Sequence, residues 1–201
     1  VQTCALPIKG LSWHQSLFYS LFQSATTRSA GLQTIDVTTL SDPTNIIMGI
    51  LMFIGSSPSS VGGGIRTTTF AILILFLINF SNNADKTSIK VYNREVHIMD
   101  IQRSFAVFTM ATILTFLGML IISATENGKL TFLQVFFEVM SAFGTCGLSL
   151  GVTSDISDIS KVVLMILMFI GRVGLISFII MIAGRREPDK FHYPKERIQI
   201  G

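Results

Sequence analysis

The sequence predicts an all-α integral membrane protein built from repeated units of outer helix, short re-entrant helix, glycine-bearing loop and inner helix. Three observations support this fold class. Of the 201 residues, 49% are hydrophobic and only 13% are charged, whereas soluble domains carry about 25% charged residues. Several apolar stretches are long enough to enter or cross a bilayer. A hexapeptide also recurs at a fixed offset within the chain.

The composition offers no case for a nucleic-acid partner, because the net charge is only +3 and the basic residues are not clustered with aromatic ones. Residues 1–8, VQTCALPI, resemble the translation of a common sequencing-library adapter, so we leave them out of the fold prediction. A natural loop is the alternative. Without these residues Cys146 is the only cysteine, which excludes a disulfide framework or a cysteine metal cluster.

Two apolar runs predict membrane-spanning helices. Residues 162–183 form 22 nearly unbroken apolar positions, about 33 Å of helix, and residues 105–124 form a similar run. A third span is broken, because residues 55–64 separate the apolar stretches 46–54 and 65–80 with one proline and four glycines. Such a segment cannot continue a regular helix.

Two shorter stretches, residues 14–26 and 131–143, are helical in pattern but too short to cross a bilayer. Each precedes a glycine-containing polar segment. We predict that both are re-entrant half-helices.

The basic residues predict the orientation of the spans, because cytoplasmic loops are enriched in Lys and Arg. Two stretches are basic, and the connections between the other spans carry only Lys129 and Lys161. The basic positions are Lys86, Lys90, Arg94 and Arg103 in the first stretch and Arg185, Arg186, Lys190, Lys195 and Arg197 in the second. We expect both stretches to be cytoplasmic and the half-helices to enter from outside.

The chain repeats itself at an offset of 116 residues. The hexapeptide ILMFIG occupies residues 50–55 and again 166–171, and Gly31 matches Gly147 in the same register. These matches indicate an internal repeat. Repeats arranged around an axis enclose a pore.

The glycine-bearing segments after the half-helices are candidate ion-selectivity filters. Backbone carbonyls can replace the water shell of a potassium ion, and the partially negative C-terminal end of each half-helix favours a cation. A plain helix C-cap is the alternative for either segment taken alone. The candidate residues are Thr27, Arg28, Ser29, Ala30 and Gly31 in one segment and Thr145, Cys146, Gly147 and Leu148 in the other.

The break in the third span is a candidate gate. A deformable loop at mid-membrane below a filter is placed to obstruct a pore, and its candidate residues are Ser59, Gly62, Gly63 and Gly64. A phosphate-binding loop is excluded because the GxxxxGK[ST] spacing and its lysine are missing. A simple cytoplasmic turn is the alternative.

Arg172 lies in the middle of the last predicted span, where a charge costs about 2.5 to 3.5 kcal/mol unless it faces protein or water. We expect Arg172 to face protein or water, with a structural ion pair or carbonyl clamp as the alternative. No nucleophile and base occur at catalytic spacing, so we do not expect an enzyme.

Three motifs resemble the Trk/Ktr/HKT superfamily of potassium transporters, most closely the Ktr-type membrane subunit. They are TTRSAG at residues 26–31, SPSSVGGGIRTTT at 57–69 and SAFGTCGL at 141–148. The resemblance covers residues 11–201. It departs from the family pattern at Cys146, commonly a small aliphatic residue, which leaves the ion preference open.

The resemblance implies a potassium-channel-like fold of four repeats, of which this chain carries the last two. Residues 9–80 are then the third repeat without its outer helix, and residues 81–103 a cytoplasmic loop. Residues 104–184 are the fourth repeat, and residues 185–201 a cytoplasmic tail.

The resemblance also implies that Arg172 belongs to the gate, as the inner-helix arginine beside the loop. It further implies potassium uptake, with or without the help of sodium, by a multi-pass protein of the bacterial plasma membrane. The implied partners are the lipid bilayer, a second copy in a homodimer and a cytosolic nucleotide-binding regulatory subunit. No cofactor is expected in this chain. The alternative function is a secondary transporter whose re-entrant hairpins bind another solute.

Overall fold

The computed structural model describes residues 12–58, 60–82, 90–91, 94–175 and 177. Apart from a two-residue antiparallel ladder, the regular elements in these ranges are helices. In chain order they are α1 (Trp13–Thr26), η2 (Val37–Thr39), α2 (Asp42–Phe53), α3 (Thr67–Asn82), β1 (Lys90–Val91), β2 (Arg94–Glu95), α4 (Ile98–Thr125), α5 (Phe132–Phe143) and α6 (Asp158–Val173).

Capping residues define where both half-helices begin. At the start of α1 the Ser12 N–H donates to the Gln15 Oε1 at 3.2 Å. At the start of α5 the Thr131 N–H donates to Gln134 Oε1 at 2.9 Å, and the Gln134 N–H donates back to the Thr131 hydroxyl. Such reciprocal bonds satisfy amide groups that the first turn leaves unpaired. Both helices coincide within one residue with the predicted half-helices.

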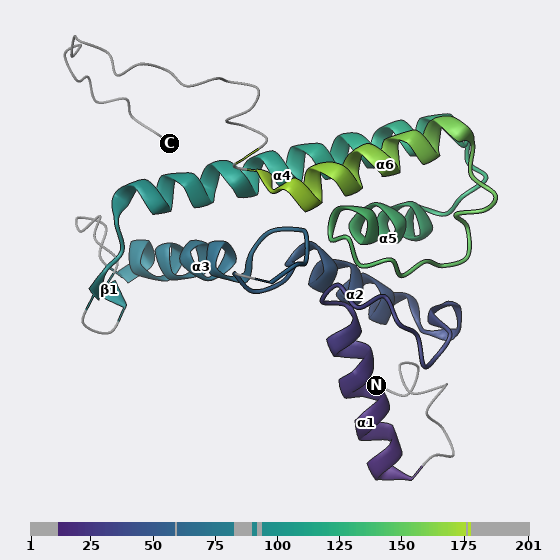
Figure 1. The fold of residues 1–201 in the computed structure, drawn as a ribbon, viewed down its shortest axis with the longest axis horizontal. Coiled ribbons are helices and arrows are strands. Elements are labelled where there is room, and N and C mark those ends of the chain that lie inside the picture. Colours follow the sequence, from purple (N-terminus) through teal and green to yellow (C-terminus); the bar gives the residue numbers. More distant parts are fainter. Residues whose placement is uncertain (1–11, 59, 83–89, 92–93, 176, 178–201) are drawn as a thin grey trace.

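The predicted break in the third span is confirmed. Helix α2 ends at Phe53 and α3 begins at Thr67, and the two lie roughly end to end with the intervening residues looped between them (Figure 1). We call residues 54–66 the interhelix loop. Its far end returns to the end of α2, because the Ile65 N–H donates to the Phe53 carbonyl at 3.1 Å.

The two predicted unbroken spans differ in outcome. Helix α4 has 28 residues, about 42 Å, and is the one helix in the described ranges that is long and apolar enough to cross a membrane. Helix α6 ends at Val173, where Gly174 adopts a φ of +87° that a right-handed helix cannot contain. The prediction of one continuous helix over residues 162–183 is therefore wrong at Gly174. Residues 178–183 lie outside the described part of the chain.

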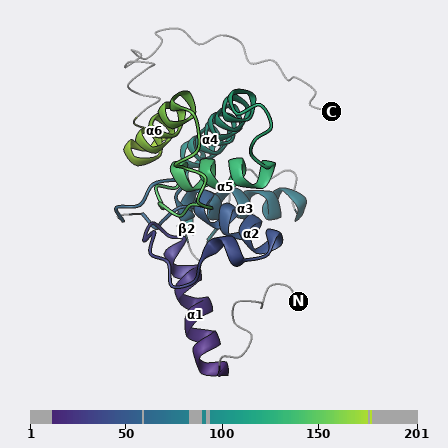
Figure 2. The ribbon, with the colours of Figure 1, turned by 90° about the vertical axis from the view of Figure 1, so that its right-hand side faces the viewer.

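Helix α5 lies at the centre of the packing. Helices α4 and α6 lie side by side along one side of it, and α2 packs against it from another (Figures 1 and 2). Phe137, Val139 and Phe143 of α5 are completely buried. This core fixes the position of the residues that follow α5.

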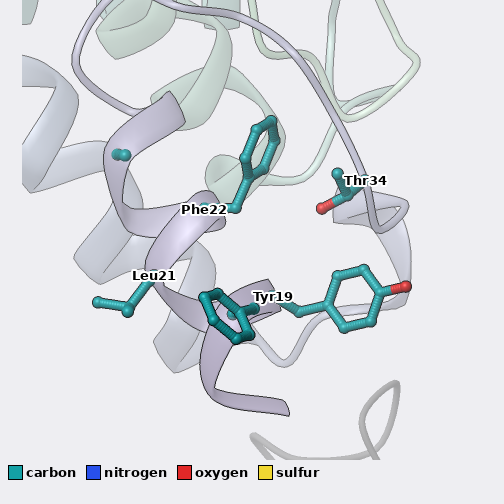
Figure 3. A pocket seen from close by; sticks show the side chains of 6 residues that line it. Tyr19, Leu21, Phe22 and Thr34 are labelled. Carbon is teal, nitrogen blue, oxygen red and sulfur yellow. The ribbon is translucent and has the colours of Figure 1, made fainter. Parts of the chain in front are cut away.

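Helix α1 projects away from the other helices (Figures 1 and 2). Its apolar side chains are largely exposed, with Trp13 68% and Phe18 70% accessible. The rings of Tyr19 and Phe22 lie toward Thr34 around an open hollow of about 470 Å³ (Figure 3). This side of α1 thus offers apolar surface that the described residues do not cover.

Candidate functional site: two glycine-bearing segments and the interhelix loop

The residues after α1 and after α5 share an unusual backbone pattern. We call residues 27–32 the first segment and residues 144–148 the second segment. Ser29 and Thr145 both have positive φ, +76° and +51°, and so do Gly31 and Gly147, at +66° and +91°. Each pair is separated by the 116-residue offset of the sequence repeat. Positive φ is rare for a β-branched residue such as Thr145 and is found where neighbouring structure imposes it.

The two segments lie in contact. A Cβ added to Gly31 would collide with the carbonyl oxygen of Cys146, so glycine is required there by the close approach of the second segment. The Cys146 thiol donates to the Thr26 carbonyl at 3.2 Å and is 5% exposed. The Cys146 side chain thus links the second segment to the end of α1.

The carbonyl oxygens of the two segments remain largely available. Within the described part of the chain, the carbonyls of residues 29–31 and 145–147 accept no hydrogen bond. Buried or membrane-embedded carbonyls are normally paired, so unpaired ones at the ends of two half-helices suit coordination of a cation.

Other predicted filter residues have structural contacts. The Thr27 hydroxyl donates to the Ser24 carbonyl at 2.7 Å, and Thr27 is 2% exposed. Leu148 is 1% exposed and belongs to the core between α2 and α5. Ala30 is exposed.

The chain following the second segment is fastened to α5 by Glu138, a residue that the sequence analysis did not single out. Its carboxylate accepts hydrogen bonds from the Ser149 hydroxyl, from the Leu150 N–H at 3.2 Å and from the Thr153 hydroxyl at 3.1 Å. Glu138 is 7% exposed. Its signal in the sequence is a lone carboxylate within an apolar half-helix, because such a charge requires partners.

The interhelix loop lies against both segments. The Gly63 N–H donates to the Thr145 hydroxyl at 2.9 Å, and a Cβ on Gly62 would collide with the Ser29 hydroxyl. Within the loop, Gly55 lies so close to the Gly63 carbonyl that it has no room for a side chain. Ser59 lies outside the described residues.

Two hollows adjoin the interhelix loop. One, of about 410 Å³, is lined by residues of the second segment and of α6: Ser141, Thr145, Cys146, Gly147, Met168, Phe169 and Arg172. The other, of about 430 Å³, is lined by Gly64 and Arg66 of the loop, by Thr68 and Thr69 of α3 and by residues 173–175. Gly63 contacts Thr145 of the first hollow and precedes Gly64 of the second. The loop therefore adjoins both hollows.

The two arginines differ in their contacts. The Arg28 guanidinium donates from Nη1 to the Gly55 carbonyl at 3.1 Å, so its side chain bonds the loop although its position was predicted as part of a filter. The Arg172 side chain is exposed into the hollow beside the second segment. It makes no hydrogen bond or ion pair to another described residue. Its predicted role in the gate stays a prediction.

The described residues include no group of three or more His, Cys, Asp or Glu side chains arranged to hold a metal ion. The oxygen atoms that suit a cation are backbone carbonyls and hydroxyls.

Comparison with known proteins places the chain in a family. A family model described as TrkH, cation transport protein, matches residues 3–192. The chain belongs to this TrkH family. It is 52% identical over 192 residues to the Ktr system potassium uptake protein D of Bacillus subtilis, covering 96% of this chain and 42% of that protein.

Two further comparisons agree with the TrkH family. The chain is 34% identical to the Ktr system potassium uptake protein B of Vibrio alginolyticus, over 90% of this chain and 39% of that protein. The crystal structure of the potassium transporter TrkH from Vibrio parahaemolyticus has the same fold, with a TM-score of 0.72 at 22% identity, covering 90% of this chain and 41% of that one. This TrkH-family chain spans about two fifths of the length of these relatives.

Proposed function

We propose that the protein carrying this chain transports potassium ions into a bacterial cell through a filter made partly of the first and second segments. The single observation that carries the proposal is the pair of half-helices, each ending in a segment with the same positive-φ positions and unpaired carbonyls. The names of the relatives, potassium uptake proteins of the Ktr system, support potassium as the ion.

In this proposal a dehydrated potassium ion binds carbonyl oxygens of residues 29–31 and 145–147. The C-terminal ends of α1 and α5 point their partial negative charge at the same place, which favours cations over anions. Because carbonyls carry no full charge, the ion is held loosely enough to move on. We propose that further segments outside this chain complete the ring.

The interhelix loop is proposed as the gate. Its support is its position: Gly62 and Gly63 lie against residues of both segments, and the loop adjoins two hollows. Its glycines lack side chains, so the loop can leave this place at small steric cost. An ion that has left the filter would meet the loop before the second hollow.

The partners are proposed from the family resemblance. They are a second copy in a homodimer, a cytosolic nucleotide-binding regulatory subunit and the lipid bilayer of the bacterial plasma membrane. Sodium is proposed to assist uptake. Regulation is proposed to come from the cytosolic subunit.

The test is uptake by a bacterium that lacks its own potassium uptake systems, with the protein expressed from its whole gene. Growth at limiting potassium and uptake of rubidium as a tracer are expected, and both should fall when residues 141–148 are replaced by an unrelated apolar sequence. The proposal would be contradicted if the host expressing the unaltered protein grew no better than the host without it.

A further inference from the structure

The end of α2 leaves backbone carbonyls without helical partners. In a continuous helix the Gly55 carbonyl would accept from the amide four residues further on, but the helix ends at Phe53. Such carbonyls within a membrane need another donor. The partner of Gly55 is the Arg28 guanidinium, at 3.1 Å.

Gly55, near the start of the interhelix loop, lies against Gly63 and Gly64 near its end. Its Cα packs against Gly64, and a side chain at Gly55 would collide with the Gly63 carbonyl. Gly63 in turn is the residue that reaches Thr145. A bond to the Gly55 carbonyl therefore anchors the place where the two ends of the loop approach each other, as well as the end of α2.

The arginine occurs in one repeat only. Position 144, which corresponds to Arg28 at the 116-residue offset, is a glycine whose Cβ would collide with the Met52 carbonyl. The second segment thus has no room for a side chain there. Of these two corresponding positions, only the one in the first segment carries a guanidinium, and that group bonds the interhelix loop.

We propose that Arg28 is a latch that holds the interhelix loop in its blocking position through the Gly55 carbonyl. This inference rests on the proposed function of the loop as a gate. Arg28 acts through the loop, so it is a positioning residue rather than an ion ligand. A charged donor to a carbonyl is stronger than a neutral one, yet a single bond of this kind can be broken when the loop opens.

The first test measures flux per folded molecule in proteoliposomes, using the protein expressed from its whole gene. Arg28→Met is expected to raise the maximal potassium flux about three- to tenfold with little change in apparent affinity, because one charged hydrogen bond to the closed loop is lost. Arg28→Lys, which keeps a cationic donor, should lie between wild type and Arg28→Met. Arg103→Met, near the start of α4, is the matched control and should behave as wild type.

A background lacking residues 59–63 separates a latch from a direct charge effect on the ions. If Arg28 acts through the loop, Arg28→Met should change nothing further in that background, whereas a charge effect would persist. An equal increase in both backgrounds, or no increase with the loop intact, overturns the proposal. If deletion of residues 59–63 alone leaves flux unchanged, the proposed gating role of the loop is contradicted. If wild type carries no potassium, the transport function fails.

Hydrogen–deuterium exchange tests the latch independently of transport. Arg28→Met should accelerate exchange in a peptide covering residues 55–66 and leave a peptide covering α5 unchanged. Equal acceleration in both peptides indicates a general structural role and overturns the latch. If neither Arg28→Met nor Arg28→Lys accumulates as folded protein, Arg28 is required for folding, and the proposal is likewise overturned.

Discussion

Gly31 and Gly147 occupy corresponding positions but differ in the space around them. A Cβ at Gly31 would collide with the Cys146 carbonyl, whereas a Cβ at Gly147 would meet no atom within 4 Å. Both residues have positive φ, which costs a non-glycine residue about 1–2 kcal/mol. Gly147 therefore offers the cleaner substitution, because a side chain there changes the backbone preference without a clash.

We expect Gly147→Ser to lower potassium uptake or to let sodium compete, with the ratio of potassium to sodium uptake falling about tenfold. The reason is that the side chain restricts the carbonyl geometry that replaces hydration. The measurement is tracer uptake with and without sodium. Gly128→Ser is the control, because Gly128 has a φ of +78° and equally open surroundings but lies outside both segments. Unchanged uptake and selectivity in Gly147→Ser would contradict the filter assignment.

Glu126 connects the end of α4 to the start of α6. Its carboxylate accepts from the Ser157 N–H and the Ser160 hydroxyl, each at 2.8 Å. The hydrogen bond from the Ser157 amide, followed by those from the Ser160 and Ser157 hydroxyls, lowers the pKa of Glu126 below its ordinary value. A lowered pKa means that the ionised form stabilises the fold above the ordinary carboxyl pKa, and that this contribution is lost as the pH falls through the lowered value.

We accordingly expect Glu126→Gln to melt at a lower temperature than wild type at pH 7, with the difference shrinking as the pH falls below about 4. Thermal unfolding of the detergent-solubilised protein measures this. Asp155→Asn, an exposed carboxylate bonded to the neighbouring Ser154 hydroxyl, should change little. A difference that stays constant with pH would disprove the role of the ionised carboxylate.

At the scale of elements, the interhelix loop and the end of α6 meet beneath the second segment. A Cβ at Gly63 would lie 3.0 Å from the Gly171 carbonyl, and Arg172 follows on the same helix. We infer that loop and arginine form one barrier below the filter. In that case the filter would determine the apparent affinity for potassium, and the barrier would determine the maximal potassium flux.

Deleting residues 59–63, or replacing Arg172 by alanine, should raise the maximal potassium flux severalfold while leaving apparent affinity less altered. Flux is measured per folded molecule, because a purely structural Arg172 would instead reduce the amount of folded protein. Met168→Leu, on the same hollow, is a conservative control. Flux at or below wild type for both variants would eliminate the gating role.

At the scale of the whole molecule, α4 determines the orientation. Its length of about 42 Å exceeds a hydrocarbon core of about 30 Å, so we predict that it spans the membrane with its two ends on opposite sides. Arg103 lies near its first turns, and Lys129 follows its last. From the distribution of basic residues we predict that the Arg103 end is cytoplasmic.

We expect Lys129→Cys to react with a membrane-impermeant maleimide in intact cells and Arg103→Cys to react only after permeabilisation. Labelling of the parent protein, whose Cys146 is buried, provides the baseline. Reaction of both positions from the same side would show that α4 does not span.

The sequence by itself determined the elements whose signals are local. Apolar or amphipathic stretches too short to cross a bilayer, each followed by a glycine-containing polar segment, predicted α1 and α5. The proline and glycines of residues 55–64 predicted the break between α2 and α3. The 116-residue offset predicted that two segments correspond, and their positive-φ positions do coincide. Composition and the span of α4 predicted the membrane class.

Only the tertiary structure decided which groups meet. The Arg28 side chain bonds Gly55, Gly63 bonds Thr145, and Glu138 binds the chain after the second segment. These contacts join residues that are 11 to 82 positions apart. No local pattern encodes such distances, since they depend on how α2 and the segments pack around α5. The end of α6 at Gly174 was also missed, because an isolated glycine is tolerated in many membrane helices and its φ is set by its surroundings.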